Sequence, residues 1–279
     1  MIVDYGLGIS LTNLSFGYGH SLTLKDIDLE VPRGTFAALL GPNGAGKSTL
    51  LETISGYLRP KKGKVLVCER PVHSLKDKER SRLVTYLAPE SKSSFDFSVE
   101  EVVIMGRLSY SQSVFSHSPD DVDFAEKAMQ ITQIEHLRHR PVTSLSSGEQ
   151  QRVQIARAIC QDPQVFLLDE PTAHLDMLFE LEIMELVTRL VQEGRTVFAI
   201  LHDVNLALRF ASRLYFMKDG VLTHSLEPND LSSDVIREVY GVNARIVEDA
   251  TSGARFVLPY AGNNVKPGSV QHICSIDTF

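Results

Sequence analysis

The chain has 279 residues, of which 43% are apolar and 23% charged, and its formal net charge at neutral pH is −7. This composition is typical of a soluble globular protein with one large or two modest cores, and the negative charge argues against a primary nucleic-acid binder. No apolar stretch approaches the roughly 20 residues that cross a bilayer, and the first ten residues do not form a signal peptide, so we expect a cytoplasmic protein that reaches a membrane only through a partner.

Short apolar runs alternate with helical segments along most of the chain. Strands are predicted at residues 11–14, 24–31, 35–40, 65–68, 165–168, 196–201 and 214–217, and helices at 47–56 and 176–192. This alternation is typical of a mostly parallel sheet with helices packed on it. Between residues 98 and 160 the strand pattern stops, and amphipathic helices are predicted at 99–105, 120–131 and 149–158. The sequence therefore predicts an α/β core with an all-helical insertion at about 91–160.

Residues 41–49 fit the phosphate-loop pattern G-x-x-x-x-G-K-[ST]. Small residues let successive backbone N–H groups turn inward and form a concavity for anions. Lys47 adds a positive charge for the β- and γ-phosphates, and the Ser48 hydroxyl is suited to ligate Mg²⁺. A strand precedes the loop and a helix follows it, so the phosphates would lie at a helix N-terminus. We therefore predict that a nucleoside triphosphate is bound by Gly41, Pro42, Asn43, Gly44, Ala45, Gly46, Lys47, Ser48 and Thr49.

Two carboxylates, Asp169 and Glu170, end an apolar strand about 120 residues after the phosphate loop. Ligands of parallel sheets bind beyond the carboxyl ends of the strands, which is where this pair would lie. We predict that Asp169 holds Mg²⁺ through water and that Glu170 polarises the attacking water as general base. Two solvated acids at a strand end are the alternative, and the phosphate loop upstream favours the nucleotide site.

The segment Leu145-Ser-Ser-Gly-Glu149, followed by Gln-Gln-Arg, nearly matches the signature LSGGQ of the ATP-binding-cassette (ABC) ATPases. With all three motifs in order, the chain resembles this family over about residues 9–260. The resemblance implies a P-loop NTPase fold: a RecA-like α/β core, an antiparallel β subdomain and the inserted helical subdomain. It also implies a head-to-tail dimer of two copies of the chain. ATP would then lie between the phosphate loop of one copy and Ser146, Ser147, Gly148 and Glu149 of the other.

The signature segment has two physical interpretations, and the sequence leaves both open. Ser146, the backbone of Gly148 and a helix N-terminus would form a second anion site for the γ-phosphate. A serine followed three residues later by glutamate is also the usual capping box of a helix. Both interpretations place the start of a helix at this segment.

Three smaller motifs fit the same resemblance. Tyr18 stands where the family has an aromatic residue that stacks on adenine, although an aromatic residue in a turn is the alternative. Residues 175–176 match the loop that contacts the second copy. His202, at a strand end about 30 residues after Glu170, matches the switch histidine that contacts the γ-phosphate, whereas a lone histidine is more often structural.

Three positions depart from the family pattern. Glu90 stands where the family usually has glutamine; it can still ligate Mg²⁺, but its charge adds repulsion against Glu170 and the γ-phosphate. Ser147 replaces a glycine of the signature, and Glu149 replaces its glutamine and adds one negative charge. These departures are compatible with a slow or altered ATPase.

Residues 97–107, 170–176, 201–207 and 235–242 resemble more specifically the importers of ferric siderophores, haem and cobalamin. This resemblance implies an ATP-hydrolysing subunit that powers a multi-component importer. Its partners would be integral membrane permease subunits, which hold it at the inner face of the cell membrane, and indirectly a substrate-binding protein. The groove around residues 90–107 would receive a cytoplasmic helix of the permease. Residues 261–279 lack periodicity and are predicted to be a tail outside the ATPase domain.

Three alternatives remain at this level. The first is the ATPase of a manganese or zinc importer, which the same motifs separate poorly from the iron-chelate group. The second is a slow ATP-dependent switch module, motivated by Glu90 and Ser147. The third is a soluble, non-transport ABC ATPase acting on nucleic acid or ribosomes; such proteins usually have two cassettes or long coiled-coil insertions, and this acidic chain has neither.

Overall fold

The computed structural model of the chain describes residues 6–19, 21–89, 96–110, 117–173 and 175–260. The strands are β1 (Leu7–Phe16), β2 (Leu24–Pro32), β3 (Phe36–Leu40), β4 (Lys62–Val67), β5 (Arg70–Pro71), β6 (Val84–Leu87), β7 (Val165–Asp169), β8 (Thr196–Ile200), β9 (Arg213–Lys218), β10 (Val221–Leu226), β11 (Asn243–Glu248) and β12 (Arg255–Tyr260). The α-helices are α1 (Lys47–Ile54), α2 (Asp77–Leu83), α3 (Val99–Ile104), α4 (Pro119–Ile131), α5 (Ser147–Cys160), α6 (Met177–Gln192), α7 (Val204–Phe210) and α8 (Ser233–Tyr240).

A six-stranded sheet of order β10-β9-β3-β8-β7-β6 forms the centre of the molecule. All of its neighbouring pairs are parallel except β9 and β10. Strands β3, β7 and β8 are buried along their whole length, which explains why the sequence shows continuous apolar runs there and not alternation. The parallel sheet predicted from the alternation of elements is therefore confirmed.

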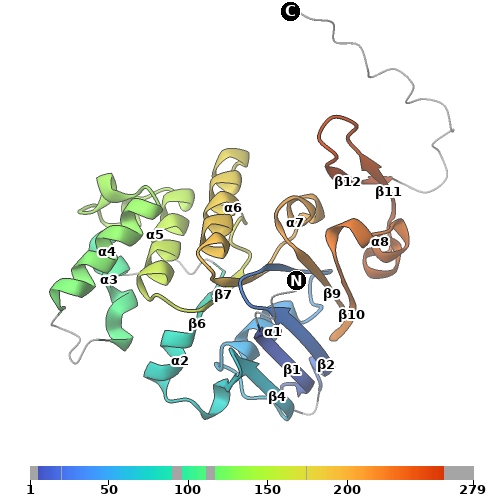
Figure 1. The fold of residues 1–279 in the computed structure, drawn as a ribbon, viewed down its shortest axis with the longest axis horizontal. Coiled ribbons are helices and arrows are strands. Elements are labelled where there is room, and N and C mark those ends of the chain that lie inside the picture. Colours follow the sequence, from blue (N-terminus) through green and yellow to red (C-terminus); the bar gives the residue numbers. More distant parts are fainter. Residues whose placement is uncertain (1–5, 20, 90–95, 111–116, 174, 261–279) are drawn as a thin grey trace, which may run out of the picture.

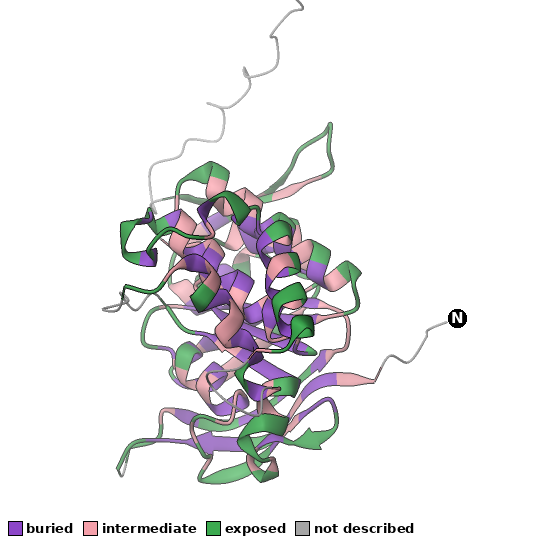
Figure 2. Ribbon diagram, turned by 90° about the vertical axis from the view of Figure 1, so that its left-hand side faces the viewer, coloured by how far each residue is buried: buried purple, intermediate pink, exposed green. Residues whose placement is uncertain are grey.

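Alternate residues of the central strands face two different cores. Ala38 and Phe166 belong to a core shared with α6, α7 and α8, whereas Ala37 and Leu167 belong to a core shared with α1 and the N-terminal strands. Those N-terminal strands make a four-stranded antiparallel sheet of order β2-β1-β4-β5. Figure 2 shows the buried segments concentrated in the middle of the molecule. The fold is thus a P-loop NTPase core with an antiparallel β subdomain, as the resemblance implied.

Helices α3, α4 and α5 gather at one end of the molecule, on the left of Figure 1. They share a hydrophobic core of their own, to which Val103, Met129 and Val153 belong. A buried ion pair joins two segments of this part: Arg107, in the 3₁₀ turn Met105–Ser109 after α3, lies with Nε 3.0 Å from Oδ1 of Asp121 on α4. These are the three helices that the sequence predicts after residue 98.

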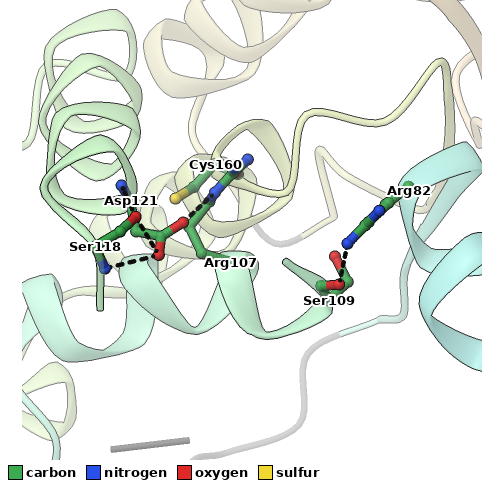
Figure 3. Close-up of polar contacts among 6 residues, drawn as sticks. All are labelled: Arg82, Arg107, Ser109, Ser118, Asp121 and Cys160. Carbon is green, nitrogen blue, oxygen red and sulfur yellow. Dashed lines mark hydrogen bonds and ion pairs between the residues drawn. The ribbon is translucent and has the colours of Figure 1, made fainter. Parts of the chain in front are cut away.

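Figure 3 shows how Arg107 connects the helices. Its Nη1 donates to the carbonyl of Cys160 at the end of α5, over 3.1 Å. Its guanidinium also lies between the rings of Tyr110 and Phe124, 3.8 Å and 4.0 Å from their centroids. Since a buried arginine is tolerated only when its donors are satisfied, this constellation fixes how the three helices pack.

The chain ends, within its described part, in helix α8 and the antiparallel hairpin of β11 and β12. Asn205 of α7 holds the hairpin: its Oδ1 accepts from the backbone N–H of Val257 over 2.7 Å, and its Nδ2 donates to the carbonyl of the same residue over 3.3 Å. The resemblance of residues 235–242 to the importer group implies a terminal helix and short strands, and α8, β11 and β12 are such elements. Strands β5, β6 and β10 and helices α2 and α7 were not predicted. The subdomain boundaries at 9–260 and 91–160 stay predictions, and the tail at 261–279 lies outside the described residues.

Within the described part of the chain, no helix combines the length and the apolar composition that crossing a bilayer requires.

Candidate functional site

The phosphate loop connects the end of β3 to the start of α1. Gly41 has φ of 143°, and a Cβ there would lie 2.1 Å from the carbonyl oxygen of Met217, so only glycine fits. Gly44 and Gly46 have φ of 79° and 97°, in the left-handed region. Gly46 is the N-cap of α1, and no side chain caps this helix end. The first N–H groups of α1 are therefore free of a side-chain cap and available to an anion.

Lys47 is folded back into the loop. Its side chain is buried, and Nζ donates to the carbonyl oxygens of Gly41 and Pro42 over 2.8 Å and 3.0 Å. Burial lowers the pKa of Lys47, while the carboxylates of Glu170 and Asp169 oppose that shift. An ammonium group close to two carboxylates and held at the loop centre supplies a fixed positive charge to any bound phosphate.

A pocket of about 410 Å³ opens over the loop. The pocket is lined by residues from the turn before β2, the phosphate loop, the start of α1 and the end of β7. These residues are Thr23, Asn43, Gly44, Gly46, Lys47, Ser48, Thr49 and Glu170. Ala45 is buried beneath the loop, where its carbonyl accepts from the N–H of Gly220 over 3.1 Å. The structure therefore brings the phosphate loop and the predicted general base to one cavity.

Asp169 is the last residue of β7 and is 1% exposed. Its Oδ2 accepts from the hydroxyl of Tyr86 over 3.0 Å, and among the described residues no donor reaches its Oδ1. Burial raises the pKa of Asp169, whereas the nearby hydroxyls of Ser48 and Tyr86 and the ammonium of Lys47 lower it. A buried carboxylate oxygen without a partner fits a cation that completes its coordination.

Glu170 and His202 form a contact that the sequence analysis did not predict. Strands β7 and β8 are parallel neighbours, with Asp169 opposite Ile200, so the residues that follow each strand emerge side by side. The Nε2 atom of His202 lies 2.7 Å from Oε1 of Glu170. Glu170 has φ of 54°, an uncommon value for a residue with a side chain. Such local strain is found where a side chain must point at a reacting group.

The signature segment is a helix start with a complete capping box. The Ser146 hydroxyl accepts from the N–H of Glu149 over 3.3 Å. The Glu149 carboxylate in turn accepts from the N–H and hydroxyl of Ser146 over 2.8 Å and 2.9 Å. Ser147 is exposed at the first helical position, and a Cβ at Gly148 would lie 3.2 Å from the ring of Phe179 on α6. The capping interpretation is confirmed, and the anion-site interpretation stays a prediction.

Two predicted residues remain, Tyr18 and Glu90. Tyr18 is 60% exposed, and its ring packs edge-to-face on Phe16 with centroids 5.1 Å apart. It is free to accept a stacked base, yet it does not line the cavity as described. Glu90 lies outside the described residues.

Residues 24–173 match the family described as ABC transporter. The chain belongs to this family. As an ABC ATPase it binds and hydrolyses ATP, and its phosphate loop, paired carboxylates and signature all lie within the matched range.

Two relatives and one solved structure illustrate the similarity. The ferric enterobactin transport ATP-binding protein of Escherichia coli is 35% identical over 248 residues, which cover 88% of this ABC ATPase and 92% of the relative. The hemin import ATP-binding protein of Rhodopseudomonas palustris is 38% identical over 260 residues, covering 88% and 94%. A dimeric ATP-binding cassette in a post-hydrolysis state, bound to ADP and Pi, has TM-score 0.71 and 27% identity, and the match covers 80% of this chain and 100% of that one.

Three residues of the site were not found from the sequence. Thr23 reaches the pocket from the turn before β2, Tyr86 contacts Asp169 from the neighbouring strand, and Phe179 packs on the signature helix. Each depends on which strands and helices are neighbours in space. A sequence signal existed only for Tyr86, which lies four residues before the expected loop residue Glu90.

Proposed function

We propose that this ABC ATPase is the ATP-hydrolysing subunit of an importer for an iron chelate, a ferric siderophore or haem, with cobalamin as the third member of that cargo class. The observation that supports the catalytic part is the close contact between Nε2 of His202 and Oε1 of Glu170, at the pocket that Lys47 also lines. The similarity to the ferric enterobactin and hemin relatives supports the cargo class.

The chemistry is mainly positioning and electrostatic stabilisation of a phosphoryl transfer. The N–H groups at the start of α1 and the Lys47 ammonium neutralise the β- and γ-phosphates. Glu170 accepts a hydrogen bond from the attacking water and orients it in line with the γ-phosphate. Nε2 of His202 lies against the Glu170 carboxylate and would hold it in place, and the predicted contact of His202 with the γ-phosphate fits its position just after β8.

Ser48 and Asp169 are the residues that would hold Mg²⁺, because one presents an exposed hydroxyl beside the loop and the other a buried carboxylate oxygen without a donor. When bound, Mg²⁺ supplies charge neutralisation at the β- and γ-phosphate oxygens. Burial in the strand end keeps the Asp169 side chain in place, and Ser48 is fixed by the first turn of α1. Glu90 remains a predicted third ligand.

A second copy of the chain completes the site. The signature residues of α5 are absent from the described lining of the pocket, so within one chain Ser146 does not face the phosphate loop. In a head-to-tail pair, the start of α5 from each copy would close on the ATP held by the other. The dimeric state of the solved cassette supports this arrangement. Tyr18 would stack on adenine at the edge of the same site.

The permease contact is assigned to a groove of about 440 Å³ between the core and the helical part. Tyr57 and Leu108, which are 79% and 40% exposed, lie on its lining, and the guanidinium-bearing Arg157 lies deeper. An amphipathic cytoplasmic helix of a permease is the partner that such a groove fits. This partner would hold the subunit at the inner face of the membrane, and a substrate-binding protein would act on the other side of the permease.

The cargo is tested by uptake. Native cells carrying Lys47→Ala in this chain are compared with wild type for labelled ferric siderophore, haem and cobalamin, and Lys64→Ala, an exposed lysine on β4, is the matched control. We expect the loss of one uptake only, with the control unchanged. Continued uptake of all three by the Lys47→Ala cells would overturn the iron-chelate assignment and direct the test to manganese and zinc.

A further inference from the structure

The carboxylate of Asp169 has two oxygens in different surroundings. Oδ2 accepts a hydrogen bond from the hydroxyl of Tyr86 over 3.0 Å, whereas Oδ1 accepts none from the described residues, although the Ser48 hydroxyl lies near the carboxylate. The side chain is 1% exposed, so water does not satisfy Oδ1 in the way it would at the surface. An unsatisfied buried oxygen is unfavourable, which makes it available to a ligand.

The direction in which Oδ1 points is not set by Asp169 alone. The terminal torsion of an aspartate is broad and roughly two-fold, so packing at Cβ leaves the plane of the carboxylate free to turn. A single hydrogen bond to one oxygen removes this freedom. Tyr86 is suited to provide it, because β6 and β7 are parallel neighbours and Tyr86 lies opposite Leu167, two residues before Asp169.

The hydroxyl of Tyr86 stays a donor. A phenol has an ordinary pKa of about 10, so it is protonated and can donate throughout the physiological range. Its ring also lines the groove between the core and the helical part, together with Tyr57. Tyr86 is thus the described side chain that both lines the groove and donates to the Asp169 carboxylate.

We propose that Tyr86 is a positioning residue: its hydroxyl turns the Asp169 carboxylate so that Oδ1 faces the divalent cation that accompanies the nucleotide. This inference rests on the cation site assigned to Ser48 and Asp169 under the proposed function. Hydrogen bonds to a metal-binding carboxylate usually contribute tenfold or more to metal affinity. Tyr86 would act through Asp169 and touch neither the cation nor the substrate.

The experiment uses the purified full chain and Mn²⁺ as the spectroscopic probe, since Mn²⁺ prefers the same oxygen ligands as Mg²⁺. Mn²⁺ binding in the presence of ADP is measured by electron paramagnetic resonance for wild type, Tyr86→Phe and Tyr57→Phe. The affinity for ADP in EDTA is measured in parallel. Tyr57→Phe is the matched control, because it removes the same hydroxyl from the same groove at a side chain that is 79% exposed.

We expect Tyr86→Phe to weaken Mn²⁺ binding about tenfold while the metal-free affinity for ADP and the control stay unchanged. Wild-type Mn²⁺ affinity in Tyr86→Phe would overturn the proposal, and so would an equal loss of metal-free ADP binding, which indicates a general disturbance. The variant Asp169→Asn distinguishes a failure of the role of Tyr86 from a failure of the cation site. If Asp169→Asn loses Mn²⁺ and Tyr86→Phe does not, only the role of Tyr86 fails; if neither loses it, the cation site fails as well.

Discussion

The imidazole of His202 lies with Nε2 2.7 Å from Oε1 of Glu170, and this contact joins the ends of two parallel strands. The two residues are 32 positions apart in the chain, and the pairing of β7 with β8 brings them together. A carboxylate held on one side by an imidazole presents its other oxygen in a fixed direction. This is the geometry that a water-orienting base needs.

Replacing Glu170 by glutamine should stop hydrolysis and leave ATP binding intact. The amide keeps the size of the side chain and its contact with His202 but cannot accept the proton of water, so we expect kcat to fall by at least about a hundredfold. Without hydrolysis, two copies closed on ATP should remain closed. Sedimentation in ATP should therefore show a stable dimer of Glu170→Gln, and a variant that stays monomeric in ATP would contradict the head-to-tail arrangement.

Removing the imidazole in His202→Ala should lower kcat, because the orientation of the Glu170 carboxylate is then no longer fixed. We expect a decrease of about a hundredfold with the dissociation constant for ATP within about twofold of wild type, because the phosphate loop is unchanged. Steady-state hydrolysis and equilibrium nucleotide binding measure the two quantities. His139→Ala is the control, since that side chain is 85% exposed and belongs to the helical part. Equal turnover in the two variants would mean that His202 is structural.

Much of the site was predictable because its rules are local. The phosphate loop needs a positive φ at Gly44 and Gly46 and a helix directly after it. Both requirements can be recognised from residues that are consecutive in the sequence. The same holds for the capping box of Ser146 and Glu149, whose spacing of three sets their contact. Contacts between residues that are close in the sequence do not depend on the rest of the fold.

The contacts that were missed depend on the order of the strands. Tyr86 and Asp169 are 83 residues apart, and their hydrogen bond exists only because β6 is the edge neighbour of β7. The predicted strand at 165–168 stands out by its apolar run, but β6 is four residues long and follows the polar helix α2, so its pattern is weak. Short edge strands give little periodicity from which to assign them.

The glutamate of the signature offers a prediction about the dimer. Glu149 accepts from both the N–H and the hydroxyl of Ser146, and the backbone N–H of Ser146 is the main reason that its pKa is lowered, so it stays ionised. In the proposed head-to-tail pair, its charge would lie close to the γ-phosphate held by the other copy. In Glu149→Gln the capping box is retained and the negative charge is removed.

We therefore expect Glu149→Gln to strengthen the ATP-dependent dimer about three- to tenfold at low salt, with a smaller gain at high salt. The comparison is made in the Glu170→Gln background, where hydrolysis does not dissolve the dimer. Glu193→Gln removes an equal charge from an exposed site at the end of α6 and should leave the dimer unchanged. A dimer weakened by Glu149→Gln would show that the carboxylate aids closure.

The buried pair of Arg107 and Asp121 predicts how the fold responds to acid (Figure 3). Burial by itself raises the pKa of Asp121, but the N–H of Ser118, the guanidinium of Arg107 and the Ser118 hydroxyl together hold it below its ordinary value. A carboxyl with a lowered folded-state pKa contributes stability that is present above its unfolded pKa of about 3.9 and is lost as pH falls through the folded value.

Asp121→Asn should accordingly destabilise the protein at neutral pH and flatten its acid dependence. We expect the free energy of unfolding to fall by about 3–5 kcal/mol at pH 7, because Arg107 is left buried without its counter-charge. Below pH 4 the difference from wild type should shrink as the wild-type carboxyl is protonated. Urea unfolding between pH 3 and pH 7 measures both, and Asp120→Asn, an exposed neighbour in the first turn of α4, is the control. A difference that stayed constant down to pH 3 would mean that the charge of Asp121 does not stabilise the helical part.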